Sequence, residues 1–284
     1  MNSVLIKINQ ATFRHRNHTF YDNFNWLIRE GEHWIITGDN GAGKTSLLHA
    51  LSGKYFPIKG SIQYPFLEEQ QEPVLSLRRK LIRVVSFRDD SRVFSPNLYF
   101  YQQRYNAFAA DGTLTVWEYL INAGFDERIE SHIKLVKKTG IFPLLDRERI
   151  KLSSGQSRKL LITKALLQEP KILIIDNPYL GLDAPSRQEF NQLLDDLVEK
   201  EGIQLILSGQ YEVLPACINR CLVLDNFEKR YEGPLQELLV SFKGGDTLKV
   251  SPPFQSSYPL SIICLLYTSP SPRDATLSRM PSSA

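Results

Sequence analysis

One eight-residue segment, Gly38–Thr45 (GDNGAGKT), constrains the fold of this chain more than any other. It follows a short apolar run, His33–Thr37, which the sequence predicts as a strand, and it opens a predicted helix, Lys44–Leu51. Glycines allow a tight loop whose backbone N–H groups face one anion, and the helix start adds partial positive charge. The segment fits the pattern G-x-x-x-x-G-K-[ST], so the sequence predicts a phosphate-binding loop between a strand and a helix.

The chemistry of this phosphate loop assigns roles to single residues. Lys44 is expected to reach the β- and γ-phosphates of a nucleotide, and the Thr45 hydroxyl is expected to ligate Mg²⁺. The residues expected to hold the phosphates are Gly38, Asn40, Gly41, Ala42, Gly43, Lys44, Thr45 and Ser46.

A second acidic element follows far along the chain. Ile172–Asp176 is a run of four apolar residues that ends in a carboxylate. Parallel sheets bind ligands outside the carboxyl ends of their strands. We therefore expect Asp176 to lie beside the Mg²⁺ held by Thr45, which makes these two residues the predicted metal ligands.

Strands alternate with helices over most of the chain. This order predicts an α/β fold with a largely parallel sheet. Further strands are expected at 4–15, 19–29, 61–64, 83–87, 204–208 and 221–225. Helices are expected at 154–168 and 185–200, and residues 97–150 are mostly helical in period.

The composition excludes several classes of protein. The chain is 42% hydrophobic and 23% charged, which is typical of globular domains and not of disordered or fibrous ones. A net charge of +3 gives no support to nucleic-acid binding. No uninterrupted apolar run is long enough for a transmembrane helix, and the first residues lack the pattern of a signal peptide. The three cysteines fit a reducing cytosol.

The last part of the chain is set apart from the fold. Residues 244–263 (Gly-Gly, Pro-Pro and Ser-Ser pairs) are predicted to be a linker. Residues 264–284 resemble a translated sequencing adapter, which is not expected to belong to the native fold. The native chain is therefore expected to continue differently after about residue 263.

Two further motifs lead to a family. Leu152–Gln156 (LSSGQ) precedes the acidic strand, and Gly181–Asp183 (GLD) follows it. In this order and spacing, the four motifs resemble those of the ATP-binding cassette (ABC) ATPases. The resemblance implies a P-loop NTPase of ABC type over residues 1–243, with a mixed central sheet and an antiparallel β subdomain. It also implies a helical subdomain at about 97–160, with ATP and Mg²⁺ as ligands.

The family also implies a partner, because ABC cassettes meet head to tail. Each nucleotide then lies between the phosphate loop of one cassette and the LSSGQ-type signature of the other. By this resemblance, Ser153, Gly155 and Gln156 would contact the nucleotide of a second cassette, and Asp183 would contact that cassette itself. Phe13 resembles the residue that stacks on adenine, with Tyr21 as the alternate.

Three positions depart from the family pattern, all around the expected γ-phosphate. Asn177 stands where the family has the glutamate that acts as a base, and an amide cannot take a proton. The family's switch histidine is replaced in Ser208–Gln210, where Gln210 is the remaining candidate. Ser86-Phe87 stands in place of a glutamine. With Lys44, Asp176, Asn177 and Gln210 as the expected catalytic residues, the sequence predicts a site that holds ATP and hydrolyses it slowly.

Two segments, Thr139–Arg147 and Leu152–Leu160, resemble the first half of tandem soluble ABC ATPases of the ModF type, which are linked to molybdate transport. The expected function is an ABC ATPase that powers or regulates transport, paired with a second cassette on the same or another chain. A membrane permease is a further possible partner, which would place the chain in the cytoplasm or on the inner face of the membrane. The alternative is a soluble ABC ATPase or nucleotide-dependent clamp that acts on a macromolecule without a transporter.

Overall fold

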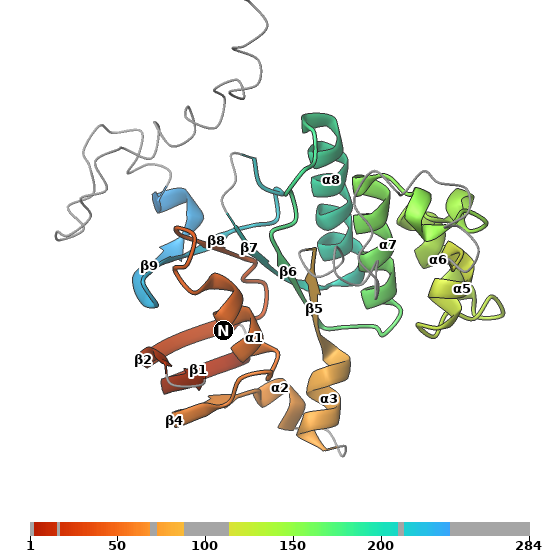
Figure 1. Cartoon of the computed structure of the whole chain (residues 1–284). Coiled ribbons are helices and arrows are strands. Elements are labelled where there is room, and N and C mark those ends of the chain that lie inside the picture. Colours follow the sequence, from red (N-terminus) through yellow and green to blue (C-terminus); the bar gives the residue numbers. More distant parts are fainter. Residues whose placement is uncertain (1–2, 16–17, 69–72, 88–113, 210–212, 239–284) are drawn as a thin grey trace, which may run out of the picture. The chain divides into compact units, whose positions relative to one another are not determined.

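Two β-sheets with helices around them form the part of the chain that the structure describes (Figure 1). In this computed structural model, the described residues are 3–15, 18–68, 73–87, 114–209 and 213–238. They lie within one compact unit, residues 1–239. Several predictions fall outside them: Gln210, residues 97–113 of the helical insertion, the linker at 244–263 and the segment 264–284.

The smaller sheet is antiparallel, with strand order β2-β1-β4. Its strands are β1 (Val4–His15), β2 (His18–Arg29) and β4 (Pro57–Gln63). Ile8 of β1 faces Trp26 of β2, and both side chains are buried. Alternate residues of an antiparallel strand point to the same face, so β1 and β2 supply one apolar layer.

The larger sheet has six strands in the order β5-β6-β7-β3-β8-β9. All neighbouring pairs are parallel except β8 and β9, which form an antiparallel hairpin. The strands are β3 (Trp34–Thr37), β5 (Ile82–Ser86), β6 (Ile172–Asp176), β7 (Gln204–Ser208), β8 (Arg220–Asp225) and β9 (Glu228–Pro234). The predicted α/β fold with a mixed sheet is confirmed.

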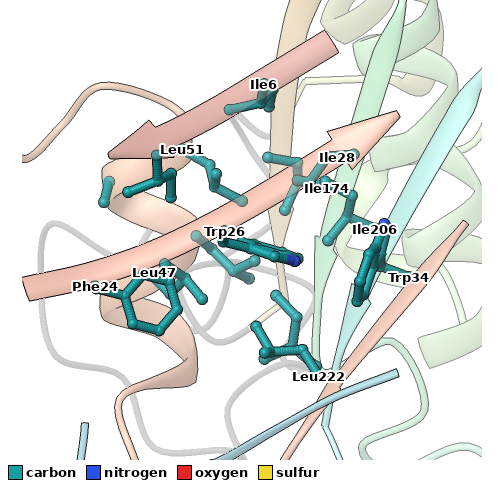
Figure 2. Packing of buried hydrophobic residues seen from close by; sticks show 14 of the residues in the cluster. Ile6, Phe24, Trp26, Ile28, Trp34, Leu47, Leu51, Ile174, Ile206 and Leu222 are labelled. Atoms are coloured by element: carbon teal, nitrogen blue, oxygen red, sulfur yellow. The ribbon is translucent and has the colours of Figure 1, made fainter. Parts of the chain in front are cut away.

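Helices cover the two faces of this sheet. On one face, α1 (Lys44–Leu51) and the antiparallel sheet pack around Trp34, Ile36 and Ile174. Trp26 and Trp34 meet edge to face there, with ring centroids 5.1 Å apart (Figure 2). On the other face, α7 (Ser154–Leu166) and α8 (Ala184–Glu201) pack on the alternate strand residues, such as Leu173 and Ile175. The sheet therefore separates α1 from α7.

A third apolar cluster holds the helical subdomain together. Val116 and Leu120 of α5 and Val136 of α6 are buried in one cluster with Leu160 of α7. The elements there are α5 (Val116–Ile121), α6 (Glu130–Lys138), η3 (Phe142–Leu144) and η4 (Arg149–Lys151). Thr115 caps α5 in a reciprocal pair with Glu118, a capping box.

The sequence prediction misses three elements and shortens a fourth. The missed elements are β9 and the helices α2 (Pro65–Glu68) and α3 (Val74–Leu81), and β4 begins four residues before the expected strand at 61–64. Among the described residues, no helix combines the length and apolarity that a membrane crossing requires.

Candidate nucleotide-binding site

The phosphate loop runs from the end of β3 to the start of α1, as its sequence predicts. Gly38, Gly41 and Gly43 all have positive φ angles (142°, 90° and 105°), which side chains rarely adopt. A Cβ on Gly38 would overlap the carbonyl oxygen of Leu224, whereas one on Gly41 would meet no atom within 4 Å. Gly38 is therefore required for packing against β8, and Gly41 leaves open space over the loop.

Lys44 closes on its own loop. Its Nζ donates to the carbonyl oxygens of Gly38 and Asp39, at 2.7 and 2.8 Å. A lysine ammonium has three donors, so the carbonyl oxygens hold the charge in place at the mouth of the cradle. Phosphate oxygens of an anion on the loop would replace these carbonyl oxygens as the acceptors for Lys44 Nζ.

Asp176, the last residue of β6, accepts hydrogen bonds from the polar side chains around it. Thr45 Oγ1 donates to Asp176 Oδ2 at 2.9 Å, although the two residues are 131 positions apart. Asn177 Nδ2 donates to Asp176 Oδ1 at 2.8 Å, and the hydroxyl of Ser208 donates to that same oxygen. The structure thus brings together the two residues that the sequence predicts as metal ligands. A hydroxyl and a carboxylate are oxygen donors of the kind that Mg²⁺ accepts.

A polar row crosses three neighbouring strands at this level. In the register of the sheet, Ser86 of β5 pairs with Asp176 of β6, which pairs with Ser208 of β7. Carboxyl ends of parallel strands meet at one edge, so these side chains lie at the expected ligand-binding edge of the sheet. In the sequence, Ser86 and Ser208 stand out only as replacements for other residues, and the hydrogen bond from Ser208 to Asp176 is not predictable from it.

Asn177 adopts a left-handed backbone conformation, with φ at 51°. Its backbone N–H donates to the carbonyl oxygen of Ser208 at 2.9 Å. Asparagine tolerates this conformation better than most residues. Hydrogen bonds from both the backbone and the side chain of Asn177 therefore hold its side-chain amide beside Asp176.

The signature motif forms the start of α7. Ser153 caps the helix by accepting from Gln156 N at 3.2 Å, while Gln156 Oε1 accepts from Ser153 N at 3.0 Å. Ser153 is exposed, and Gly155 and Gln156 are partly exposed. These three residues line a hollow of about 290 Å³ together with Gly140, Pro143, Leu144, Lys159, Ser186, Glu189 and Phe190. The motif is presented outward, on the sheet face opposite to α1.

Asp183 caps the next helix in the same way. Its Oδ1 accepts from Ser186 N at 3.2 Å, and hydrogen bonding to Ser186 lowers the pKa of this exposed carboxyl. Leu180, three residues before Asp183, is 61% exposed, which is unusual for a leucine beside a buried strand. The Leu180–Asp183 loop and the signature therefore both present groups to the surface.

The structure does not present Phe13 or Tyr21 to a ligand. Phe13 is 0% exposed and Tyr21 is 1% exposed, so both rings are packed in the core of this structure, and the stacking of Phe13 on adenine, with Tyr21 as the alternate, stays a prediction. The reason is a break in the register of β1 between Ala11 and Phe13, which turns three consecutive residues inward. The Tyr21 hydroxyl is buried next to the phosphate loop, and burial raises the pKa of this phenol.

Sequence reasoning misses one aromatic residue at the loop. Phe227, in the turn between β8 and β9, donates its backbone N–H to Ala42 O at 3.0 Å. Its ring lies against Gly43. The only signal in the sequence is an aromatic residue in a hairpin turn, where small or polar residues are usual.

Comparison with known proteins connects this site to a family. The family model described as ABC transporter matches residues 21–180. The uncharacterized ABC transporter ATP-binding protein C323.04 of Schizosaccharomyces pombe is 26% identical over 90% of this chain and 53% of its own length. The ABC transporter ATP-binding protein ModF of Escherichia coli is 29% identical over 82% of this chain and 45% of its own length. The chain spans about half the length of these two relatives.

Solved structures share the fold. CbiO1 of Clostridium perfringens, part of the ABC transporter complex cbiONQ, superposes with a TM-score of 0.69 at 22% identity, over 86% of this chain and 93% of that chain. The dimeric structure of the bacterial ABC transporter cassette MJ0796 gives a TM-score of 0.60 at 22% identity, over 81% and 99% of the two chains.

Proposed function

Because this chain belongs to the ABC transporter family of ATP-binding cassettes, we propose that it binds Mg-ATP, pairs head to tail with a second cassette and hydrolyses its own ATP slowly. The observation that carries the proposal is Asn177, whose amide donates to Asp176 at the centre of the site. ABC ATPases as a family hydrolyse ATP, so a cassette with a weakened site would have a regulatory role in the pair.

The cradle fits a nucleoside triphosphate and its metal ion. The backbone of residues 38–46 would hold the phosphates at the start of α1, where N–H groups and the helix dipole favour anions. Thr45 and Asp176 would hold Mg²⁺, since their oxygen atoms already meet at 2.9 Å. When bound, the ion neutralises charge on the phosphate oxygens. Lys44 would exchange the carbonyl oxygens of Gly38 and Asp39 for phosphate oxygens.

The slow hydrolysis follows from the residue next to Asp176. The Asn177 amide orients a water molecule or the carboxylate, but it cannot accept a proton, and general-base help is typically worth about 10²–10⁴ in rate. Ser208, bonded to Asp176, occupies the neighbouring strand end. Gln210 remains our candidate for a contact to the γ-phosphate.

The exposed signature supports pairing with a second cassette. Ser153, Gly155 and Gln156 lie at the start of α7, on the opposite sheet face from α1 and away from the chain's own phosphate loop. They would therefore serve the nucleotide of a partner, and Asp183 on its exposed loop would contact that partner. A dimeric ABC cassette is known in MJ0796, which shares this fold.

The length of ModF supports a partner within the same polypeptide. Because ModF is about twice as long as the matched region, we propose that this cassette is one half of a tandem pair. The second half would supply a competent catalytic site, completed by Ser153 and Gly155 of this chain. A membrane permease would be the further partner in a transport role, with the pair in the cytoplasm or on the inner face of the membrane.

Ser86 favours a second candidate, a soluble ABC ATPase or clamp that acts on a macromolecule. Ser86 is the last residue of β5 and Phe87 follows it, and the Phe87 ring packs on Phe190 and beneath the Arg158 guanidinium, at 5.0 Å. Serine and phenylalanine stand here in place of the glutamine of the family pattern, and a phenylalanine ring packed on Phe190 offers no polar group to a permease. Fractionation separates the candidates, because a permease partner would retain the chain in washed membranes.

The test compares Asn177→Glu with Asn177→Gln in the purified chain. We expect the unmodified chain to bind Mg-ATP and to turn it over well below the usual range of about 1–10³ s⁻¹. Asn177→Glu should raise turnover about 10²–10⁴-fold, and Asn177→Gln should not. Turnover by the unmodified chain within the usual range would contradict the weak site. Failure to bind ATP would contradict the proposal as a whole.

A further inference from the structure

Arg158 lies on α7, two residues after the signature motif Leu152–Gln156, and it is only 6% exposed. A charged side chain is rarely buried unless it is bound, because taking the charge out of water costs free energy. Binding of the chain's own nucleotide does not explain this burial, since α7 and the phosphate loop lie on opposite faces of the large sheet. The contacts of the guanidinium therefore indicate a different role.

The guanidinium of Arg158 connects three segments of the chain. Its Nη2 donates to the carbonyl oxygen of Leu180, the first residue of the Leu180–Asp183 loop. The same guanidinium lies over the Phe87 ring, 5.0 Å from its centroid, and Phe87 directly follows β5. That ring packs edge to face on Phe190 of α8, with centroids 6.4 Å apart. A planar guanidinium can donate from its edge and stack with its face at the same time, which a lysine ammonium cannot do.

The same side of α7 contacts this part of the chain one turn earlier. Gly155 of the signature precedes Arg158 by three residues, so the two positions lie on one side of the helix. A Cβ on Gly155 would stand 3.8 Å from Leu182 Cδ2 and 3.8 Å from Ser186 Oγ, which is ordinary van der Waals contact. The helix that carries the signature therefore packs directly against Leu182 and Ser186.

Further hydrogen bonds give the loop its local shape. Leu180 N donates to Asn177 O at 3.5 Å, and Arg187 of α8 donates from Nε to Leu182 O at 3.0 Å. These bonds lie within the loop or join it to α8. The bond from Arg158 is different, because it joins the loop to the helix that carries the signature.

We propose that Arg158 is a positioning residue, which fixes the signature motif and the Leu180–Asp183 loop as one surface for the second cassette. The inference rests on the proposed function, since it requires a partner that contacts both Ser153 and Asp183. Both residues are exposed, and a partner that meets them together binds better when their spacing is set in advance. Arg158 sets this spacing from the buried side of the surface.

The first measurement is amide hydrogen exchange, followed by mass spectrometry, on the full chain and on Arg158→Met and Arg158→Lys. Methionine keeps an apolar stem and removes every donor. A hydrogen bond to a charged group corresponds to about a 10- to 150-fold change in an equilibrium. We expect Arg158→Met to raise exchange rates in residues 180–187 by about that factor and to leave residues 38–46 unchanged. Arg158→Lys should give a smaller increase, because its ammonium can still donate to Leu180 O.

Arg78→Met is the matched control. Arg78 is also buried, at 8% exposed, and its guanidinium lies over the rings of Phe56 and Tyr64. Tyr64 belongs to the apolar cluster on the α1 face of the sheet, so Arg78 is far from α7. Its replacement should lower stability, but it should not raise exchange in residues 180–187 more than in the rest of the chain.

The second measurement reports on the site that the signature would complete in a partner. Turnover and KM for Mg-ATP are measured for the chain with Asn177→Glu, alone and combined with Arg158→Met or Arg78→Met. We expect Arg158→Met to lower kcat by about 10- to 150-fold with KM nearly unchanged, because the phosphate loop lies on the other face of the sheet. Arg78→Met should leave kcat unchanged while the chain is folded.

Three results would overturn the proposal. In the first, Arg158→Met leaves exchange in residues 180–187 unchanged. In the second, exchange rises there but kcat does not fall. In the third, Arg158→Met and Arg78→Met raise exchange throughout the chain and lower kcat equally, which would mean a general loss of stability. Arg158→Lys keeps the test valid if Arg158→Met does not fold.

A failure of the proposed function looks different from a failure of this inference. The chain with Asn177→Glu would then show no turnover even with Arg158 in place. The exchange measurement would still decide whether Arg158 holds the Leu180–Asp183 loop.

Discussion

Gly38 and Gly41 belong to one loop, yet replacing each with alanine should have very different effects on stability. Both residues have positive φ, so a side chain at either costs about 1–2 kcal/mol of backbone strain. Only at Gly38 does the new Cβ overlap a backbone atom, the carbonyl oxygen of Leu224. That oxygen belongs to β8 and cannot rotate away, and overpacking of this kind adds about 1–3 kcal/mol.

The expected free energy of unfolding therefore falls by about 2–5 kcal/mol for Gly38→Ala and by about 1–2 kcal/mol for Gly41→Ala. The measurement is urea unfolding of the nucleotide-free chain, so that loss of ligand binding does not contribute. Gly202→Ala calibrates the strain alone, because this residue ends α8 with φ at 65° and a Cβ there would meet no atom within 4 Å. Equal losses for Gly38→Ala and Gly41→Ala would refute the reasoning.

Three further predictions concern residues outside the loop. Burial lowers the pKa of His33, so below about pH 6.5 the unfolded chain binds a proton that the folded chain does not. The free energy of unfolding, measured with urea, should therefore decrease as the pH is lowered through this range. The decrease should be smaller in His33→Gln. Ser153→Ala and Thr115→Ala each remove a helix cap worth about 0.5–2 kcal/mol, but only Ser153→Ala should also lower ATP turnover in the glutamate variant described above; an equal effect of both on turnover would contradict a role for the signature in a partner's site. Burial raises the pKa of Cys217 and, to about 12, that of Cys221, so peptide mapping after iodoacetamide treatment at pH 8 should find both unmodified until urea is added; rapid labelling of the folded chain would be inconsistent with this burial.

The elements that were predictable from the sequence carry a strong local signal. The glycines around Lys44 and the apolar run before Asp176 specify a loop and a buried strand with little help from the rest of the chain. Their contact follows from topology, because β3 and β6 are parallel strands of one sheet whose carboxyl ends share an edge. The hydrogen bond between Thr45 and Asp176 is the result.

The features that were missed depend on register and on distant partners. β9 is a polar strand, and its turn has no glycine, so neither the apolar pattern nor the turn chemistry marks it. The spacing of Phe13 from the loop resembles that of the family's adenine-stacking residue, but it does not show the shift in pairing with β2 and β4 that accompanies the burial of the ring. A shift of one residue reverses the facing of a strand, and a single sequence does not show where such a shift occurs.

The position of β6 divides the nucleotide site into two parts of unequal rigidity. The strand is paired on both edges, and its alternate residues belong to the apolar clusters on both faces of the sheet. Amides in such a strand exchange with solvent only when the whole domain opens. We therefore expect slow amide exchange along β6 up to Asp176, whereas the exposed residues Asn40 and Gly41 lie on a loop outside any strand. A ligand entering this site would contact the rigid end of β6 on the side of Asp176 and the exposed loop with Asn40 and Gly41 on the other side.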